Sequence, residues 1–210
     1  MPRLKWPTLK RSLIAILRGV KPNEIDAITE ALLEEGFEAI EVPLNSPDPF
    51  ASIEKAVKLA PKNVLIGAGT VLTIDDVARL EGVGGNLMIS PNVVPEVIDA
   101  AVQKQMVTMP GVLTPTEALA AVSAGASGLK FFPASILGPS GIKAIMAVLP
   151  SDITIGAVGG VSEDNFAAYK AAGISAFGLG SSLYKPGATA DEVRAKARTV
   201  ITAYDLVYGS

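Results

Sequence analysis

Lys130 is the residue of this chain with the clearest capacity for chemistry. It stands in the segment GLKFFP, residues 128–133, with apolar neighbours on both sides. Burial among such neighbours disfavours an ammonium ion and lowers the pKa of the lysine, which leaves a neutral amine that can attack a carbonyl. The alternative is a lysine at a strand end whose ammonium reaches solvent. The segment by itself leaves both interpretations open.

Composition narrows the chemistry that could accompany Lys130. The 210 residues include no histidine and no cysteine, which excludes a Ser-His-Asp triad, thiol chemistry and a histidine-ligated zinc site. Catalysis must therefore use Lys, Glu, Asp, Arg, Ser, Thr, Tyr or backbone groups. A net charge of −3 provides no broad basic surface for nucleic acid. No apolar run approaches the roughly 20 residues of a membrane span.

The first twelve residues differ from the rest of the chain. They carry four basic residues, two prolines and no acidic residue, and they lack the apolar core of a secretory signal. We therefore expect residues 1–12 to form a solvated arm, residues 13–210 to form the catalytic domain, and the protein to be cytoplasmic.

Short apolar runs alternate with amphipathic ones along the remainder of the chain. The runs predict eight strands, at Leu13–Arg18, Ala39–Leu44, Leu65–Thr70, Leu87–Pro91, Val107–Gly111, Gly128–Pro133, Ile153–Gly159 and Ala176–Ser181. The amphipathic segments predict helices at Asn23–Glu35, Pro49–Leu59, Ile74–Glu81, Pro95–Lys104, Pro115–Ser123, Gly141–Val148, Glu163–Ala172 and Asp191–Tyr204. Eight such units indicate a single-domain α/β protein, a closed (β/α)8 TIM barrel. An open doubly wound sheet is the rival, but it usually has fewer strands at this length.

Polar residues inside these strands indicate where the chemistry lies. Successive strand residues point to opposite faces, and the outer face of a barrel strand must be apolar because it packs on helices. The polar face of each strand should therefore point inward: Arg18 with Ile14 and Ile16, Glu41 with Ala39 and Pro43, Thr70 with Ile66 and Ala68, and Lys130 with Gly128 and Phe132. These groups should meet near the carboxyl ends of the strands, where barrel enzymes carry out catalysis. The alternative is a buried ion pair of Glu41 with Lys130 or Arg18, although desolvation offsets most of its attraction.

Glycines follow the last two predicted strands, in AVGGV at residues 157–161 and GLGSS at residues 178–182. Glycine lets a ligand approach backbone N–H groups, and these two loops commonly bind phosphate in barrels. The alternative is that these glycines only allow tight turns and bind no ligand. A buried amine, a carboxylate, an arginine and a phosphate loop together indicate a Schiff-base enzyme for a phosphorylated 2-oxo acid. Such an enzyme requires no metal and no organic cofactor.

The chain resembles the 2-dehydro-3-deoxy-phosphogluconate/phosphogalactonate aldolases, which are class I aldolases on a (β/α)8 barrel. The resemblance covers nearly the whole chain in order, through IAILRG (14–19), EVPLNS (41–46), GAGTVL (67–72), SPN (90–92), PG (110–111), LKFFP (129–133), VGGV (158–161) and GLGS (178–181). It implies that Lys130 forms the Schiff base and that Glu41 is the general acid/base. It also implies binding roles for Thr70 and Pro91 at the pyruvyl group, Phe132 beside the imine, and Gly159, Gly160, Gly180 and Ser181 at the phosphate. Ser182 and Tyr184 are further candidates at the phosphate, and the resemblance implies a homotrimer.

Three positions indicate the branch of the family. Asn45 stands where phosphogluconate enzymes usually carry an arginine, and Val158 stands where they usually carry a threonine. We therefore expect Arg18 to bind the substrate carboxylate and Val158 to alter the preference at C4, as in the phosphogalactonate branch. A phosphogluconate or dual-specificity aldolase is the alternative. A barrel enzyme without an imine, and a non-catalytic barrel that binds sugar phosphates, are the more distant alternatives.

Overall fold

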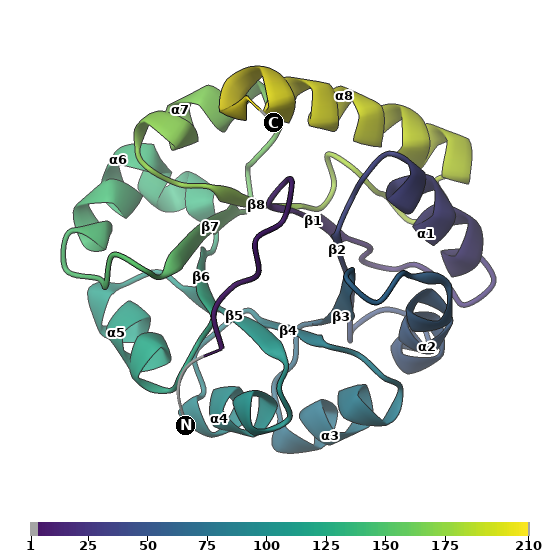
Figure 1. The fold of residues 1–210 in the computed structure, drawn as a ribbon, viewed down its shortest axis with the longest axis horizontal. Coiled ribbons are helices and arrows are strands. Elements are labelled where there is room, and N and C mark those ends of the chain that lie inside the picture. The colour runs from purple at the N-terminus through teal and green to yellow at the C-terminus, as the bar shows by residue number, and fades with distance from the viewer. Residues whose placement is uncertain (1–3, 210) are drawn as a thin grey trace.

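A closed barrel of eight parallel strands forms the centre of the molecule, and helices surround it (Figure 1). The computed structural model describes residues 4–209. The strands run in chain order around the barrel: β1 Leu13–Ile16, β2 Ala39–Pro43, β3 Leu65–Gly69, β4 Leu87–Ser90, β5 Val107–Val112, β6 Gly128–Phe131, β7 Thr154–Val158 and β8 Ala176–Leu179. The helices are α1 Ile25–Glu34, α2 Pro49–Leu59, α3 Ile74–Gly82, α4 Pro95–Gln103, α5 Pro115–Ser123, α6 Ala134–Met146, α7 Phe166–Ala171 and α8 Ala190–Tyr208. The predicted single-domain (β/α)8 barrel is confirmed.

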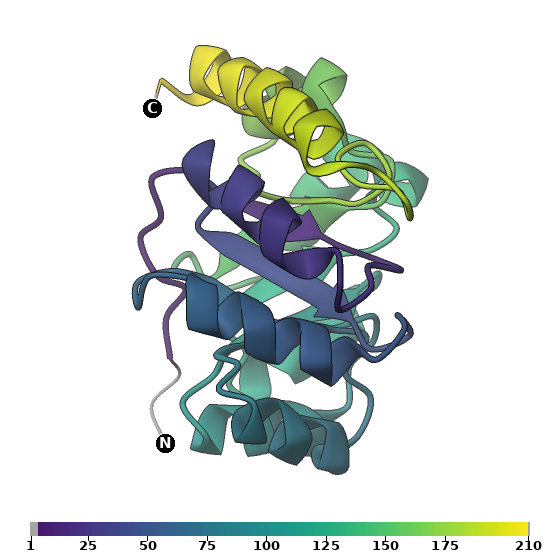
Figure 2. The ribbon, with the colours of Figure 1, turned by 90° about the vertical axis from the view of Figure 1, so that its right-hand side faces the viewer.

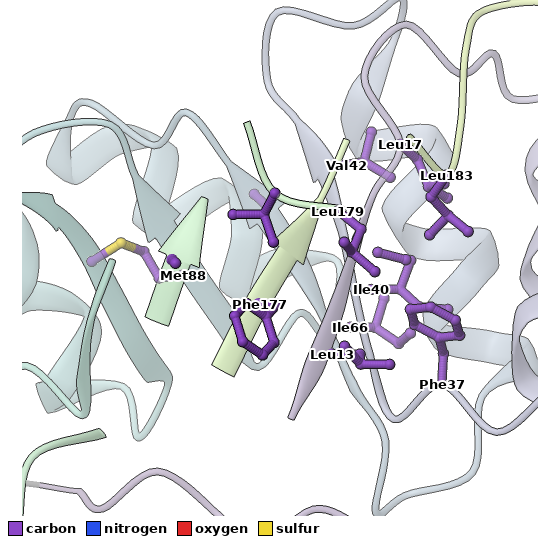
Figure 3. Close-up of a cluster of buried hydrophobic side chains, with 14 of the residues drawn as sticks. Leu13, Leu17, Phe37, Ile40, Val42, Ile66, Met88, Phe177, Leu179 and Leu183 are labelled. Atoms are coloured by element: carbon purple, nitrogen blue, oxygen red, sulfur yellow. The ribbon is translucent and has the colours of Figure 1, made fainter. Parts of the chain in front are cut away.

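Two apolar layers stabilise the barrel, one on each side of its strands. The outer layer packs strand residues against the helices, and Figure 3 shows part of it around Leu13, Ile40 and Phe177. The inner layer lies at the amino ends of the strands: Ile14, Ala39, Leu65, Leu87, Ile89, Val107, Met109 and Ala176. Burying these side chains on both faces of the sheet is the main source of stability in such a fold.

The division of side chains between the two layers tests the predicted strand faces. Ile14 and Ala39 belong to the inner layer, as the faces of Arg18 and Glu41 require, and Leu129 belongs to the outer layer, opposite Lys130. The prediction for the third strand is wrong, because Ile66 and Ala68 belong to the outer layer. Thr70 follows the last residue of β3 and has a φ of 58°, so the alternation of strand faces does not extend to it.

Residues 4–12 are not a solvated arm, which corrects the expectation for this part of the segment. They cross the amino end of the barrel (Figure 1), and Leu4, Trp6 and Leu9 pack against the inner apolar layer. Arg11 fixes the segment to α8 through two hydrogen bonds to the carboxylate of Asp205, at 2.6 and 2.5 Å. Residues 1–3 lie outside the described range.

The helix after β6 begins earlier than predicted. It starts at Ala134 and is interrupted at Gly138, which has a φ of 62° and a ψ of 175°. Gly138 and Pro139 indicate a loop in the sequence, and this loop signal hides the helical turn that precedes them. The predicted helix 163–172 is also divided, into a 3₁₀ helix at Glu163–Asn165 and α7. No helix in residues 4–209 combines the length and the apolar character needed to cross a membrane.

Candidate active site

Lys130 and Glu41 occupy the buried centre of the site. Lys130 belongs to β6 and is 6% exposed, and Glu41 belongs to β2 and is 3% exposed. Burial lowers the pKa of Lys130 to about 8, against the opposing attraction of Glu41. Burial raises the pKa of Glu41 to about 7, although the charges of Lys130 and Arg18 act in the opposite direction. The predicted inward orientation of both groups therefore produces an amine that loses its proton unusually easily and a carboxylate that gains one.

The two groups influence each other electrostatically without forming a contact ion pair. Within residues 4–209, no nitrogen–oxygen distance of 4.0 Å or less joins Lys130 to Glu41. The Glu41 Oε2 atom is buried and has no hydrogen-bond partner in the described part of the chain. An unpaired buried carboxylate oxygen costs free energy unless a ligand or a water satisfies it. The buried ion pair considered as an alternative is therefore not the arrangement found.

Gly69, the last residue of β3, determines where the Glu41 carboxylate lies. A Cβ atom built on Gly69 would come within 1.6 Å of Oε2 and 2.4 Å of Cδ. The carboxylate therefore lies directly over the Gly69 backbone, in space that any other residue would fill. Because φ of Gly69 is not positive, the glycine is required here for close approach and not for backbone conformation.

Replacing Gly69 with alanine is expected to displace the Glu41 carboxylate and to reduce catalytic turnover by at least roughly tenfold, up to the loss caused by removing a general acid/base. The barrel should still fold, because the group that must move is the end of a flexible side chain. Steady-state kinetics and thermal unfolding measure the two effects. The matched control is Gly82→Ala on α3, where an added Cβ meets nothing within 4 Å. A wild-type kcat in the Gly69→Ala enzyme would show that the position of the Glu41 carboxylate over Gly69 is not needed for turnover.

Phe132 lies beside the lysine. The Lys130 Nζ atom is 5.0 Å from the centroid of the Phe132 ring. This distance permits a cation–π attraction when the amine is protonated, and it leaves an apolar wall beside the amine when it is neutral. The proximity agrees with the position that the family resemblance implies for Phe132.

Arg18 follows β1 and is held by the loop after β2. Its Nη1 atom donates a 2.6 Å hydrogen bond to Oδ1 of Asn45, and the backbone N–H of Gly19 donates to Oγ of Ser46 at 2.9 Å. The Arg18 charge also lowers the pKa of both Lys130 and Glu41. Asn45 thus orients an arginine that follows the neighbouring strand.

A cavity of about 520 Å³ opens beside these groups. It is bounded by the end of β1 and by the loops after β7 and β8. Seven predicted site residues line it: Arg18, Phe132, Val158, Gly159, Gly160, Gly180 and Ser181. The lining also includes Ser182, Tyr184 and Lys185. The catalytic candidate Lys130 lies next to the cavity, because its amine faces the ring of Phe132, which lines the cavity. A volume of this size can hold a small phosphorylated sugar acid.

The two glycine loops form one side of the cavity. Gly159 and Gly160 both have positive φ, 88° and 76°, so the backbone there requires glycine. The Ser182 hydroxyl donates to the Val161 carbonyl at 3.4 Å and thereby connects the two loops. Ser181 is exposed, and its hydroxyl has no hydrogen-bond partner in residues 4–209. Ser181 is therefore better placed than Ser182 to contact a ligand.

Four predicted site residues do not line this cavity: the catalytic candidates Lys130 and Glu41, and Thr70 and Pro91. Thr70 directly follows Gly69, the residue over which the Glu41 carboxylate lies. Its left-handed backbone is strained for a β-branched residue, at a cost of roughly 1–3 kcal/mol, and such strain concentrates at functional sites. Pro91 follows β4, and its carbonyl lies against Gly111, where an added Cβ would come within 2.4 Å of the oxygen.

Sequence reasoning missed Gly69 and Lys185, and it missed the contact of Asn45 with Arg18. Gly69 stands in the matched segment GAGTVL, yet its close approach to a carboxylate depends on the register of β2 with β3, in which Pro43 pairs with Gly69. Lys185 stands five residues after Gly180. Its position on the loop after β8 is the only feature of the sequence that could have indicated a place at the site.

A buried lysine of lowered pKa beside a buried carboxylate, on the inner wall of a (β/α)8 barrel, defines a class I aldolase. The model of the KDPG and KHG aldolase family matches residues 8–198. The chain belongs to this family of carbon–carbon lyases.

Three similar proteins carry more specific names. A "Probable 2-dehydro-3-deoxy-6-phosphogalactonate aldolase" of Rhizobium meliloti (strain 1021) is 67% identical, over 100% of this chain and 99% of its own length. A "2-dehydro-3-deoxy-6-phosphogalactonate aldolase" of Escherichia coli (strain K12) is 46% identical, over 96% of this chain and 98% of its own length. A solved structure described as "Native KDPGal structure" is 44% identical, covers 99% of this chain and 100% of its own, and superposes with a TM-score of 0.95.

Proposed function

We propose that this aldolase cleaves 2-dehydro-3-deoxy-6-phosphogalactonate to pyruvate and glyceraldehyde 3-phosphate. The observation that carries the proposal is the buried Lys130 amine, whose pKa is lowered to about 8 and on which the Glu41 charge acts, next to Phe132 on the wall of the cavity. The names of the relatives support the choice of substrate. We further propose that the enzyme is cytoplasmic and, from the family, that it is a homotrimer.

The reaction begins at Lys130. Its neutral amine attacks the C2 carbonyl of the substrate and forms a carbinolamine, which loses water to give an iminium ion. Glu41 supplies and removes the protons of this dehydration, since its pKa of about 7 allows both protonation states near neutral pH.

Carbon–carbon cleavage follows at the iminium ion. The Glu41 carboxylate takes the proton of the C4 hydroxyl, the C3–C4 bond breaks, and its electron pair passes into the iminium to form an enamine. Glyceraldehyde 3-phosphate leaves from the C4–C6 end. Protonated Glu41 then returns a proton to C3, and water hydrolyses the imine to release pyruvate and the Lys130 amine.

The remaining groups of the site orient the substrate. Arg18, held by Asn45, binds the C1 carboxylate in a charge-assisted pair. Thr70 and Pro91 shape the pyruvyl pocket, and Phe132 packs beside the imine. The phosphate binds to the Gly159–Gly160 loop and to Gly180, with the free hydroxyl of Ser181 as a further donor.

Val158 leads us to expect selection at C4. It lines the cavity as the last residue of β7, and its methyl groups cannot donate a hydrogen bond to the C4 hydroxyl. We expect higher kcat/KM for the galacto epimer than for the gluco epimer, measured by coupling pyruvate release to lactate dehydrogenase. Val158→Thr should move the ratio toward the gluco epimer, because a hydroxyl then replaces a methyl group in the cavity. A wild-type enzyme that prefers the gluco epimer, or uses both equally, would instead be a phosphogluconate or dual-specificity aldolase.

A further inference from the structure

Lys185 is a second cation on the wall of the cavity, besides Arg18. Of the residues that line the cavity in the described chain, only Arg18 and Lys185 are charged, and no acidic residue is among them. Arg18 already has a partner in Asn45. The Lys185 ammonium has no hydrogen-bond or ion-pair partner within residues 4–209.

The backbone around Lys185 is well fixed, although its side chain is exposed. The N–H of Tyr184 donates to the carbonyl of Gly180 at 2.9 Å, and the N–H of Ala188 donates to the carbonyl of Lys185 at 2.9 Å. Pro186 packs on Gly19, where an added Cβ would come within 2.8 Å of its ring. The lysine is therefore carried by a tight turn that begins in the glycine loop after β8 and contacts the end of β1.

The two cations differ in their influence on the reacting groups. Arg18 is close enough to the reacting groups for its charge to lower the pKa of both Lys130 and Glu41. Lys185 is not among the charges that act on either group. The proposed substrate has two anionic ends as well, a carboxylate next to the reacting C2 carbon and a phosphate on C6. Each of the two cations can therefore bind a different anionic end of the substrate.

We propose that Lys185 provides the positive charge of the phosphate subsite and makes the enzyme selective for a phosphorylated aldehyde. The glycine loops supply neutral N–H donors, and an ammonium ion beside them adds a charge-assisted contact to a dianion. Because Lys185 has no partner of its own, the phosphate does not have to displace an internal carboxylate. This inference rests on the proposed function of the site.

The test compares two aldehydes in the condensation direction, glyceraldehyde 3-phosphate and unphosphorylated glyceraldehyde, each with pyruvate. In Lys185→Gln, the ratio of kcat/KM for the two aldehydes should fall roughly 10–100-fold, the loss expected for one charge-assisted contact, and most of it should appear in the KM for glyceraldehyde 3-phosphate. Lys185→Arg should restore most of the ratio. Inhibition by inorganic phosphate should weaken in Lys185→Gln and remain in Lys185→Arg.

The matched control is Lys62→Gln, which removes an exposed lysine from the loop between α2 and β3, at the opposite end of the barrel. Its aldehyde ratio should equal that of the wild type. If the wild-type enzyme prefers the phosphorylated aldehyde and Lys185→Gln keeps that preference, Lys185 has no role in phosphate binding. If the wild-type enzyme condenses neither aldehyde with pyruvate, the proposed function itself fails, so the two failures are distinguishable.

Discussion

Lys130→Met is expected to abolish both aldol cleavage and the formation of a covalent pyruvate adduct. Wild-type enzyme incubated with pyruvate and borohydride should gain the mass of one reduced pyruvyl group, and peptide mapping should place that group on Lys130. Methionine has a similar length but no amine, so neither the carbinolamine nor the iminium can form. Lys143→Met on α6 is the matched control and should keep both adduct and turnover, because Lys143 is exposed. An adduct on the Lys130→Met protein, or on a different lysine of the wild type, would disprove the assignment.

The same substitution should stabilise the protein. The folded-state pKa of Lys130, about 8, lies below its ordinary value of 10.5, so burying the ammonium costs folding free energy at any pH below about 8. The cost is of order 3 kcal/mol there, and it disappears as the pH rises from about 8 through 10.5. Without Lys130 the pKa of Glu41 rises further, so Glu41 is neutral at pH 7 and leaves no unpaired charge. A higher melting temperature together with lost activity would separate the chemical role of Lys130 from a structural one.

Glu41→Gln is expected to reduce kcat by roughly 10²–10⁴-fold, the usual contribution of a positioned general acid/base. Glutamine has nearly the same shape and fits over Gly69, so the barrel and the cavity should be retained. The pyruvate adduct should still form on Lys130, but more slowly, and prolonged trapping should reach the wild-type extent. Retention of wild-type turnover would show that another group transfers the protons.

The pH dependence provides a second measure of this pair. In the wild type, kcat/KM should fall as the pH decreases through about 8 and about 7, because Lys130 and then Glu41 become protonated. The Glu41 charge raises the pKa of Lys130, so its replacement by a neutral amide lowers that pKa. The fall in the activity of Glu41→Gln should therefore occur at lower pH than in the wild type and involve one titrating group. A fall at unchanged or higher pH would contradict the electrostatic coupling of the two residues.

Much of this arrangement is predictable from local sequence because the rules that apply to it are local. Alternation along β1, β2 and β6 correctly places Arg18, Glu41 and Lys130 on the inner side of the barrel, since an outward charge would face the apolar surface of a helix. Helix starts are equally local. The Thr114 hydroxyl accepts a hydrogen bond from the N–H of Glu117, and the Glu117 carboxylate accepts one from the N–H of Thr114. This capping box is visible as T-P-T-E in the sequence.

The remaining features depend on contacts between distant segments. The inward face predicted for Ile66, Ala68 and Thr70 is wrong for Ile66 and Ala68, because the positive φ of Thr70 ends the alternation one residue beyond β3, and no residue type indicates such strain. Gly69 becomes important only when the pairing of β2 with β3 brings the Glu41 carboxylate over it. The packing of Leu4, Trp6 and Leu9 also requires the assembled inner layer, because neighbouring lysines and prolines make the segment read as solvated.

The path of the first residues across the barrel has a practical consequence for attaching this enzyme to other objects. Both described ends of the chain lie on the side where the strands begin (Figure 2), and Tyr208 near the second end donates to the carbonyl of Ile174, just before β8. The cavity opens among loops at the other side. A surface linker, an affinity tag or a fused partner joined to either end would therefore leave substrate entry unobstructed. If the enzyme were immobilised on a solid support through its termini, the mouth of its cavity would face the solution.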